Sequence, residues 1–318
     1  MRALRREEAR EEMRRSTRTH LPFALVLSGG GARGLAHAGV LHALAHDGYQ
    51  PSAIVGVSMG AVVGVTYGLN PDWYRALREM DTSAFPQPFG ARRKALAERF
   101  RAGVAFARLV RDMVLGWGVG DRSLPAGSRL LHDLTRGDSL ERSRVPVAVV
   151  ATDLISGERV VFSRGNAAEA AYASSALAGI LPPLAQNGML LADGAYADNA
   201  PVDVARELVP EKVLAIDVGQ PSESPPHVHN GAQALARALE ICHTQHAHLL
   251  FERADLVLRP TFARPIQMLD FDDKRDVIAA GVRAVRSRRA TLARMLEATA
   301  PAPALAEHDA SRVARLDG

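Results

Sequence analysis

Short apolar runs alternate with segments of helical spacing from Phe23 to the late 280s. The apolar runs, bounded by turn residues, predict strands at 23–28, 52–57, 144–153, 158–163, 189–192, 212–218 and 255–259. Apolar positions spaced three or four residues apart predict helices at 34–47, 59–69, 166–178, 202–208, 231–251 and 273–296. This alternation predicts an α/β fold of three layers, with a mostly parallel central sheet flanked by helices.

Residues 86–131 interrupt the alternation, because they contain no strand-like run. Apolar side chains recur there at helical spacing, at Phe106, Leu109, Val110, Met113, Val114 and Trp117. Arginine and lysine side chains add positive charge, at Arg92, Arg93, Lys94, Arg99, Arg101, Arg108 and Arg111. We predict a helical insertion, and its role stays open between a lid, a contact with an anionic membrane surface and plain core packing.

The ends of the chain differ from its centre in composition. Residues 1–20 are rich in Arg and Glu and read as a charged arm, and residues 299–318 read as a poorly ordered tail. One folded domain is therefore expected at 21–298. The N-terminus lacks the apolar core of a secretory signal, and no apolar run is long enough to cross a bilayer.

Composition narrows the function classes. The 318 residues are 47% hydrophobic and 23% charged, as in ordinary globular proteins. The single cysteine, Cys242, excludes an internal disulfide and favours a cytoplasmic location, with peripheral contact to a membrane as the open alternative. The net charge of +4 accompanies no nucleic-acid-binding motif, so no nucleic-acid partner is expected, and the oligomeric state is left open.

The most informative motif is Gly56-Val57-Ser58-Met59-Gly60, between a predicted strand and a predicted helix. A serine on a sharp strand-to-helix turn exposes its oxygen, and flanking glycines permit strained angles and close packing. The helix N-terminus that follows adds N–H groups where an oxyanion would form. Ser58 is therefore the candidate nucleophile.

Two further loops are expected at the same edge of the sheet. A glycine loop, Gly29-Gly30-Gly31-Ala32-Arg33-Gly34, follows the first strand, and Asp193-Gly194 follows the strand at 189–192. Successive glycine N–H groups can line an anion site, so the loop is a candidate oxyanion hole. The rival interpretation is a dinucleotide fingerprint, but the second strand ends in Ser58 where that motif needs an acid.

The histidines do not suggest a catalytic base. His243, His246 and His248 lie on a predicted helix and are interpreted as surface residues, and His37, His42 and His46 as packing or solvated residues. Only two of the first three share a helix face, and no acidic or cysteine set completes a metal site. We predict neither a metal nor a cofactor.

These motifs together resemble the patatin-like phospholipase family, in particular its small bacterial members. The shared elements are the glycine loop, the serine motif, Ala151-Thr152-Asp153-Leu154, Ala173-Ser174-Ser175-Ala176 leading to Pro182-Pro183, Asp193-Gly194-Ala195 with Asn199 and Pro201, and a C-terminal stretch from Ala254 to Gly281. Their order extends over most of the chain. Ala178 departs from the family, many of whose members have proline at that position.

The resemblance implies a patatin-like fold and a Ser–Asp dyad without histidine. Ser58 would be the nucleophile and Asp193 the base, with an oxyanion hole at Gly29, Gly30 and Gly31. The expected supporting residues are Arg33, Gly34, Gly56, Gly60, Gly194 and Asn199. The implied activity is hydrolysis of lipid or other acyl esters through an acyl-enzyme; the alternatives are an acyltransferase and a regulatory binding module with a vestigial dyad.

Overall fold

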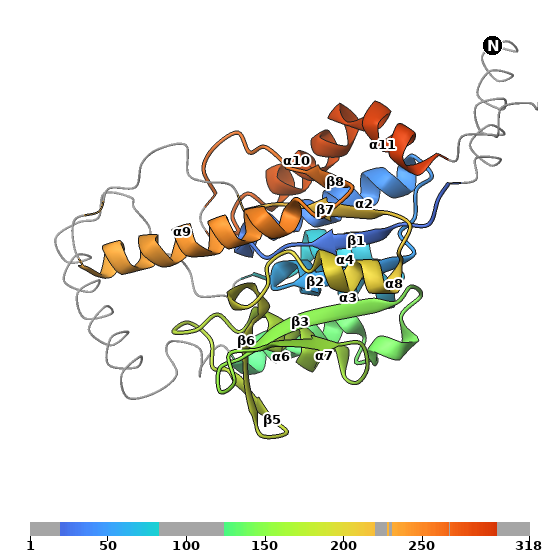
Figure 1. Ribbon diagram of the computed structural model, residues 1–318. Helices are drawn as coiled ribbons and strands as arrows, with labels where there is room; N and C mark the ends of the chain where they lie inside the picture. The colour runs from blue at the N-terminus through green and yellow to red at the C-terminus, as the bar shows by residue number, and fades with distance from the viewer. Residues whose placement is uncertain (1–19, 83–123, 220–227, 229–230, 267, 298–318) are drawn as a thin grey trace, which may run out of the picture.

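The computed structural model describes residues 20–82, 124–219, 228, 231–266 and 268–297. In this part of the chain, eight strands form one sheet in the order β5-β6-β3-β2-β1-β7-β8, with β4 also pairing β3 (Figure 1). Their bounds are β1 Ala24–Leu27, β2 Ala53–Val57, β3 Val147–Asp153, β4 Arg159–Phe162, β5 Leu184–Gln186, β6 Met189–Asp193, β7 Val213–Ile216 and β8 Leu256–Leu258.

The centre of the sheet is parallel. Strands β3, β2, β1, β7 and β8 run in one direction, so the loops that follow them leave from the same edge. Strands β4 and β6 pair antiparallel with β3, and β5 pairs antiparallel with β6. The strands predicted at 144–153 and 158–163 are confirmed as β3 and β4, which pair across the turn between them. Strands β1, β2, β3 and β7 are buried along their length, which explains their continuous apolar sequence.

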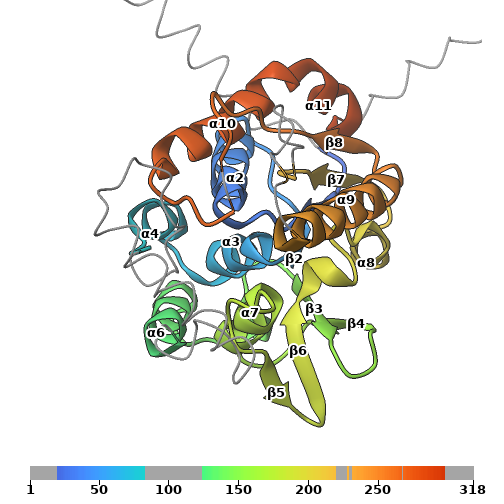
Figure 2. The ribbon, with the colours of Figure 1, turned by 90° about the vertical axis from the view of Figure 1, so that its left-hand side faces the viewer.

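Helices cover both faces of the sheet, as predicted. Alternate residues of β1 separate two cores: Leu25 and Leu27 pack with one set of helices, and Ala24 and Val26 with the other. Figure 2 shows α8 and α9 on one side and α2, α3, α4 and α6 on the other. The helices are α2 Ala36–His46, α3 Met59–Leu69, α4 Trp73–Glu79, α6 Leu124–Thr135, α7 Ala167–Ser175, α8 Val202–Leu208, α9 Gly231–Phe251, α10 Lys274–Ser287 and α11 Arg289–Leu296.

Several element boundaries differ from the sequence prediction. The helix predicted at 273–296 is two helices, α10 and α11, because the backbone breaks at Arg288. The helix predicted from residue 34 starts as a 3-10 turn, η1, at Gly31–Leu35. Helix α4 and strand β5 were not predicted; both are short, and short elements carry a weak periodic signal. Two further 3-10 turns are η3 Leu140–Arg142 and η4 Gly194–Tyr196.

The predicted insertion at 86–131 is described only from Leu124, where α6 begins. Its apolar and basic positions before that point, the charged arm and the tail lie outside the described residues, so the predicted domain limits remain predictions. None of the helices in the described ranges combines the length and apolar character that crossing a bilayer requires.

Candidate active site

Ser58 occupies the turn between β2 and α3 and has an unusual backbone. Its φ of 53° and ψ of −126° are strained for a residue with a Cβ atom. Glycines make the tight turn feasible, because a Cβ at Gly56 would collide with Ala61 and a Cβ at Gly60 with the carbonyl of Leu27. The predicted strand-turn-helix geometry around this serine is therefore present.

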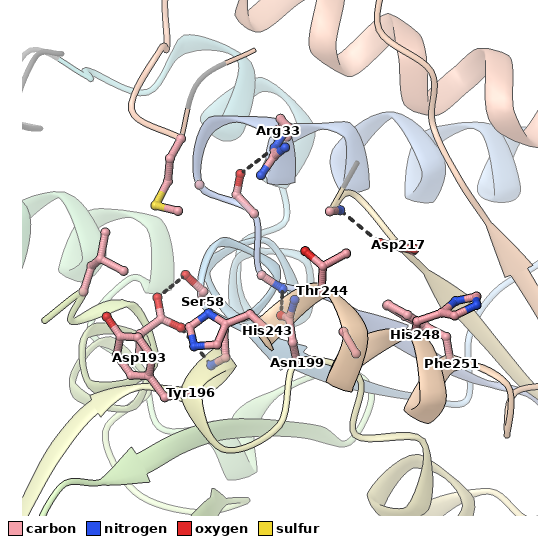
Figure 3. A pocket seen from close by; sticks show the side chains of 18 of the residues that line it. Arg33, Ser58, Asp193, Tyr196, Asn199, Asp217, His243, Thr244, His248 and Phe251 are labelled. Carbon is pink, nitrogen blue, oxygen red and sulfur yellow. Dashed lines mark hydrogen bonds between the residues drawn. The ribbon is translucent and has the colours of Figure 1, made fainter. Parts of the chain in front are cut away.

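The Ser58 hydroxyl donates a hydrogen bond of 2.6 Å to Oδ2 of Asp193, across 135 residues of sequence (Figure 3). Asp193 ends β6, and its other carboxylate oxygen accepts the N–H of Ala195 at 2.9 Å. Thr152 of β3 donates to the Asp193 carbonyl at 2.9 Å. These contacts fix the carboxylate against the serine. Both side chains belong to residues that are at most 8% exposed.

Burial changes the acidity of Asp193. Loss of solvent raises the pKa of its carboxyl to about 6, although the hydrogen bonds from Ser58 and Ala195 oppose this shift. A carboxylate with a pKa near 6 is a stronger base than an exposed aspartate and is still ionised at neutral pH. Asp193 therefore has the properties of a general base toward the adjacent hydroxyl.

The glycine loop lies beside the dyad and is held from two sides. The Gly29 N–H donates to Oδ1 of Asn199 at 2.7 Å, and the Ser28 carbonyl contacts Nε2 of His37 at 2.8 Å. Burial lowers the pKa of His37 to about 4, so at pH 7 the ring is neutral and Nε2 carries the proton that the Ser28 carbonyl accepts. The Gly29 N–H, which was expected to face an oxyanion, is therefore already hydrogen-bonded to the Asn199 side chain.

The next two glycines line the cavity beside Ser58. Gly31 has a φ of 56°, and a Cβ there would collide with the carbonyl of Met268. A Cβ at Gly30 would press on the side chain of Val218. Arg33 folds back over the loop, with its Nε 3.4 Å from the Gly30 carbonyl. The predicted glycine loop and its arginine therefore reach the site.

Two other glycines from the predicted set, Gly34 and Gly194, allow their loops to pack closely near Ser58 and Asp193. Gly34 lies against Met59, the first residue of α3, and a Cβ at Gly34 would meet its side chain. Gly194 lies against the backbone of β3, where a Cβ would collide with the carbonyl of Val150. Both positions bring their neighbouring loops close to the sheet edge.

Ser174 belongs to the site, although sequence reasoning gave it no role. It lies on α7, and its hydroxyl accepts the Ser58 N–H at 2.8 Å and donates to the Val150 carbonyl at 2.6 Å. The Ala173-Ser174-Ser175-Ala176 motif contained the signal, but a motif alone does not show which serine faces the nucleophile. Ser174 holds the strained Ser58 backbone to β3.

A cavity of about 550 Å³ opens beside Ser58 and Asp193. The second half of α9 forms one wall, and Tyr196 also lines the cavity, on the side of Asp193. The Tyr196 ring tilts against His243 with 5.4 Å between centroids, and its hydroxyl accepts the Ala178 N–H at 2.9 Å. The interpretation of His243 as a surface residue was wrong, because this half-buried ring lines the cavity. Burial lowers its pKa, which favours the neutral form.

No group of three His, Cys, Asp or Glu side chains that could hold a metal occurs among the described residues. The sheet edge instead brings together a hydroxyl, a buried carboxylate, glycine N–H groups and an apolar cavity wall. These groups are suited to nucleophilic attack on an acyl carbonyl.

Comparison with known proteins gives consistent matches. A family model described as patatin-like phospholipase matches residues 25–206. The putative patatin-like phospholipase domain-containing protein M110.7 of Caenorhabditis elegans is 33% identical over 207 residues, covering 64% of this chain and 17% of that protein. Patatin-like phospholipase domain-containing protein 6 of Homo sapiens is 32% identical, and the match covers 64% of this chain and 14% of that protein. Lysophospholipase NTE1 of Saccharomyces cerevisiae is also 32% identical, covering 64% and 11%.

This chain therefore spans less than a fifth of the length of these relatives. Among solved structures, VipD from Legionella pneumophila aligns with a TM-score of 0.42 and 16% identity, covering 83% of this chain and 67% of that chain. The type III effector protein ExoU aligns with a TM-score of 0.37 and 16% identity, and the alignment covers 85% of this chain and 53% of that chain.

Proposed function

The chain belongs to the patatin-like phospholipase family, and from this premise we propose that it is a serine acyl hydrolase acting on carboxyl esters of lipids. The observation that carries the proposal is the 2.6 Å hydrogen bond from the Ser58 hydroxyl to the buried Asp193 carboxylate, at the wall of a cavity. A nucleophile and a base within hydrogen-bond reach are the first geometric requirement for acyl transfer.

In the acylation step, Ser58 Oγ attacks the acyl carbonyl and its proton passes to Asp193 Oδ2. The carbonyl oxygen becomes an oxyanion, and the N–H groups of Gly30 and Gly31 are our candidates for stabilising it. Gly29 is a weaker candidate, because its N–H is bonded to Asn199. One oxyanion donor is worth about 3 kcal/mol of transition-state stabilisation in well-studied hydrolases.

The tetrahedral intermediate then collapses to an acyl-enzyme. Asp193 returns the proton to the leaving alcohol oxygen, and the ester bond breaks. In deacylation, Asp193 takes a proton from water, the resulting hydroxide attacks the acyl carbonyl, and Ser58 recovers its proton as the acid leaves. Each step uses one base that alternates between its two protonation states, for which a pKa of about 6 is well suited.

The cavity wall supports an apolar acyl group. Ala247 and Phe251 of α9, Leu177 and the half-exposed Met268 contribute apolar surface to the cavity. Burial of apolar surface favours binding of an acyl chain by about 25 cal/mol for each Å² removed from water. We therefore propose a lipid ester as the substrate, with contact to a membrane surface as part of its access.

The test is covalent labelling with a fluorescent fluorophosphonate, together with hydrolysis of a p-nitrophenyl ester. We expect wild-type protein to label and turn over the ester, and Ser58→Ala to lose both. Asp193→Asn should lower the rate by at least about a hundredfold, since general-base catalysis contributes that much. Ser163→Ala, at an exposed position after β4, is the matched control and should behave as wild type. Labelling that persists in Ser58→Ala contradicts the assignment of the nucleophile.

A further inference from the structure

The cavity extends along the sheet edge well beyond the dyad. The loops after β2, β1, β7 and β8 supply, in spatial order, Ser58, the glycine loop, Asp217 and Arg259, and all of them line the cavity. Figure 3 shows Ser58, Asp193 and Tyr196 at one side of the cavity and Asp217 and His248 at the other. The proposed chemistry uses only the first side, so the far side needs its own explanation.

Two charged residues define that far side. Arg259 donates through Nε to Oδ2 of Asp217 at 3.0 Å, and Asp217 Oδ1 accepts the Gly219 N–H at 3.0 Å. The aspartate side chain is 14% exposed, whereas the arginine side chain is 47% exposed. The carboxylate is therefore an inner support, and the guanidinium is the group that solvent or a ligand can reach.

Only one nitrogen of Arg259 is used by this pair. Within the described ranges, its Nη1 and Nη2 groups make no hydrogen bond. A guanidinium presents its remaining N–H groups as a planar fork that matches the two oxygens of a phosphate or carboxylate. The side chain of His248 lies on the same side of the cavity.

We propose that Arg259, supported by Asp217, binds an anionic phosphate or carboxylate group of the acyl ester that Ser58 cleaves. This inference rests on the proposed function, and it adds a specificity-determining residue at the end of the cavity opposite to the dyad. The ion pair with Asp217 fixes the plane of the guanidinium, so less conformational freedom is lost when the ligand binds.

The sheet geometry sets the span that such a substrate must cover. Strand β8 lies three strands from β2, and neighbouring strands are about 4.8 Å apart, so the strand ends carrying the two residues are separated by about 14 Å. The long arginine side chain shortens this gap. The anionic group must therefore lie several bonds away from the reacting carbonyl, either in the leaving group or along the acyl chain.

The experiment compares four esters with Arg259→Gln, Asp217→Asn and wild type. A monoacyl glycerophosphate and the matching monoacylglycerol differ by an anion on the leaving group. A dicarboxylic half-ester and the matching monocarboxylic ester differ by an anion on the acyl group. The measured quantity is the preference, the ratio of kcat/KM for the anionic ester to kcat/KM for its neutral match.

We expect Arg259→Gln to lower the preference at least about tenfold in one pair of esters, because hydrogen bonds between charged groups are lost. Asp217→Asn should keep much of that preference, because the amide oxygen can still accept the hydrogen bond from Nε and the guanidinium keeps its charge. The pair of esters that responds identifies the position of the anion. Arg294→Gln, exposed on α11 and outside the cavity lining, is the charge-matched control.

A purely structural ion pair predicts a different result. Both substitutions would then break the same contact and lower all rates alike, and that outcome would overturn the inference, as would an unchanged preference in Arg259→Gln. Calorimetric binding of the monoacyl glycerophosphate and of the half-ester to Ser58→Ala, with and without Arg259→Gln, needs no turnover. A protein that hydrolyses no ester contradicts the proposed function, whereas an affinity for both anionic esters that does not depend on Arg259 contradicts this inference alone.

Discussion

Asn199 and Gly29 are joined by a 2.7 Å hydrogen bond that ties the loop after β6 to the loop after β1. The two residues are 170 positions apart in sequence, yet this bond sets the distance between the base-bearing loop and the glycine loop. The amide of Asn199 therefore positions the proposed oxyanion donors relative to Asp193.

Replacement of Asn199 by alanine removes that bond. We expect kcat/KM for a p-nitrophenyl ester to fall about tenfold, since a hydrogen bond of this type is worth about 1 kcal/mol and its loss also loosens the glycine loop. Asn199→Asp keeps an acceptor for the Gly29 N–H but adds a negative charge beside the oxyanion, so its rate should fall further. An Asn199→Ala enzyme as fast as wild type would show that the loop is held without this bond.

The raised pKa of Asp193 predicts the pH dependence of activity. The carboxylate must be ionised to accept a proton, so the rate should rise with pH and reach half its plateau near pH 6. The measurement is kcat/KM for a neutral ester between pH 4.5 and about 8.5. A profile that falls above pH 6 would identify a protonated group, not this carboxylate, as the essential one.

The same pKa predicts an effect on stability. Folding raises the pKa from 3.8 to about 6, so the folded state prefers the protonated carboxyl and loses stability as the pH rises through this window. The loss is up to about 3 kcal/mol at 1.36 kcal/mol for each pKa unit. Asp193→Asn should therefore be more stable than wild type above pH 6, as urea unfolding of both proteins at pH 4 and pH 8 would reveal. If the difference in unfolding free energy between Asp193→Asn and wild type were the same at pH 4 and pH 8, that would argue against burial of an ionised carboxylate.

Two adjacent serines on α7 provide a matched pair. Ser174→Ala removes the acceptor of the buried Ser58 N–H and the donor to Val150, so we expect a loss of about 1–3 kcal/mol in unfolding free energy and a lower kcat. Ser175 Oγ is buried and finds no hydrogen-bond partner in the described structure. Ser175→Ala should therefore be close to neutral in denaturant unfolding and in ester hydrolysis. Similar effects of the two substitutions would contradict the role given to Ser174.

Two glycines predict opposite responses to alanine. Gly60→Ala would drive a Cβ into the Leu27 carbonyl, so we expect poor folding or a loss of several kcal/mol. Gly127, in the first half of α6, has open space around its Cα, and Gly127→Ala should raise stability by about 0.5–1 kcal/mol through helix propensity. Thermal unfolding of both variants checks this contrast. If Gly60→Ala unfolded at the same temperature as wild type, the turn at Ser58 would have room for the added methyl group.

The sequence predicted the parallel core of the sheet well, because strands that are buried on both faces consist of short continuous runs of apolar residues. It also predicted that Ser58, Asp193 and the glycine loop meet, but its reason holds only for β1 and β2, which end at one edge. Strand β6 is antiparallel, and its register, with Asp193 opposite Ala151 of β3, brings Asp193 level with Ser58. Rotation of helices was harder to predict: the pattern of α9 did not indicate that His243 faces the cavity, and α7 carries two serines of which one faces Ser58. The break at Arg288 is a change of backbone angles at one residue, which hydrophobic periodicity does not report.

The residues that line the cavity come from an earlier and a later part of the chain. The dyad and the glycine loop follow β6, β2 and β1, all within residues 25–206 or at their border, whereas β7, α9 and β8 come later in the chain. A descendant of this protein could acquire a new α9 or a new residue after β8 while its nucleophile, base and glycine loop stayed intact. Substitutions there would therefore alter the wall and the far end of the cavity, and with them the substrate preference, without replacing the groups proposed to carry the reaction.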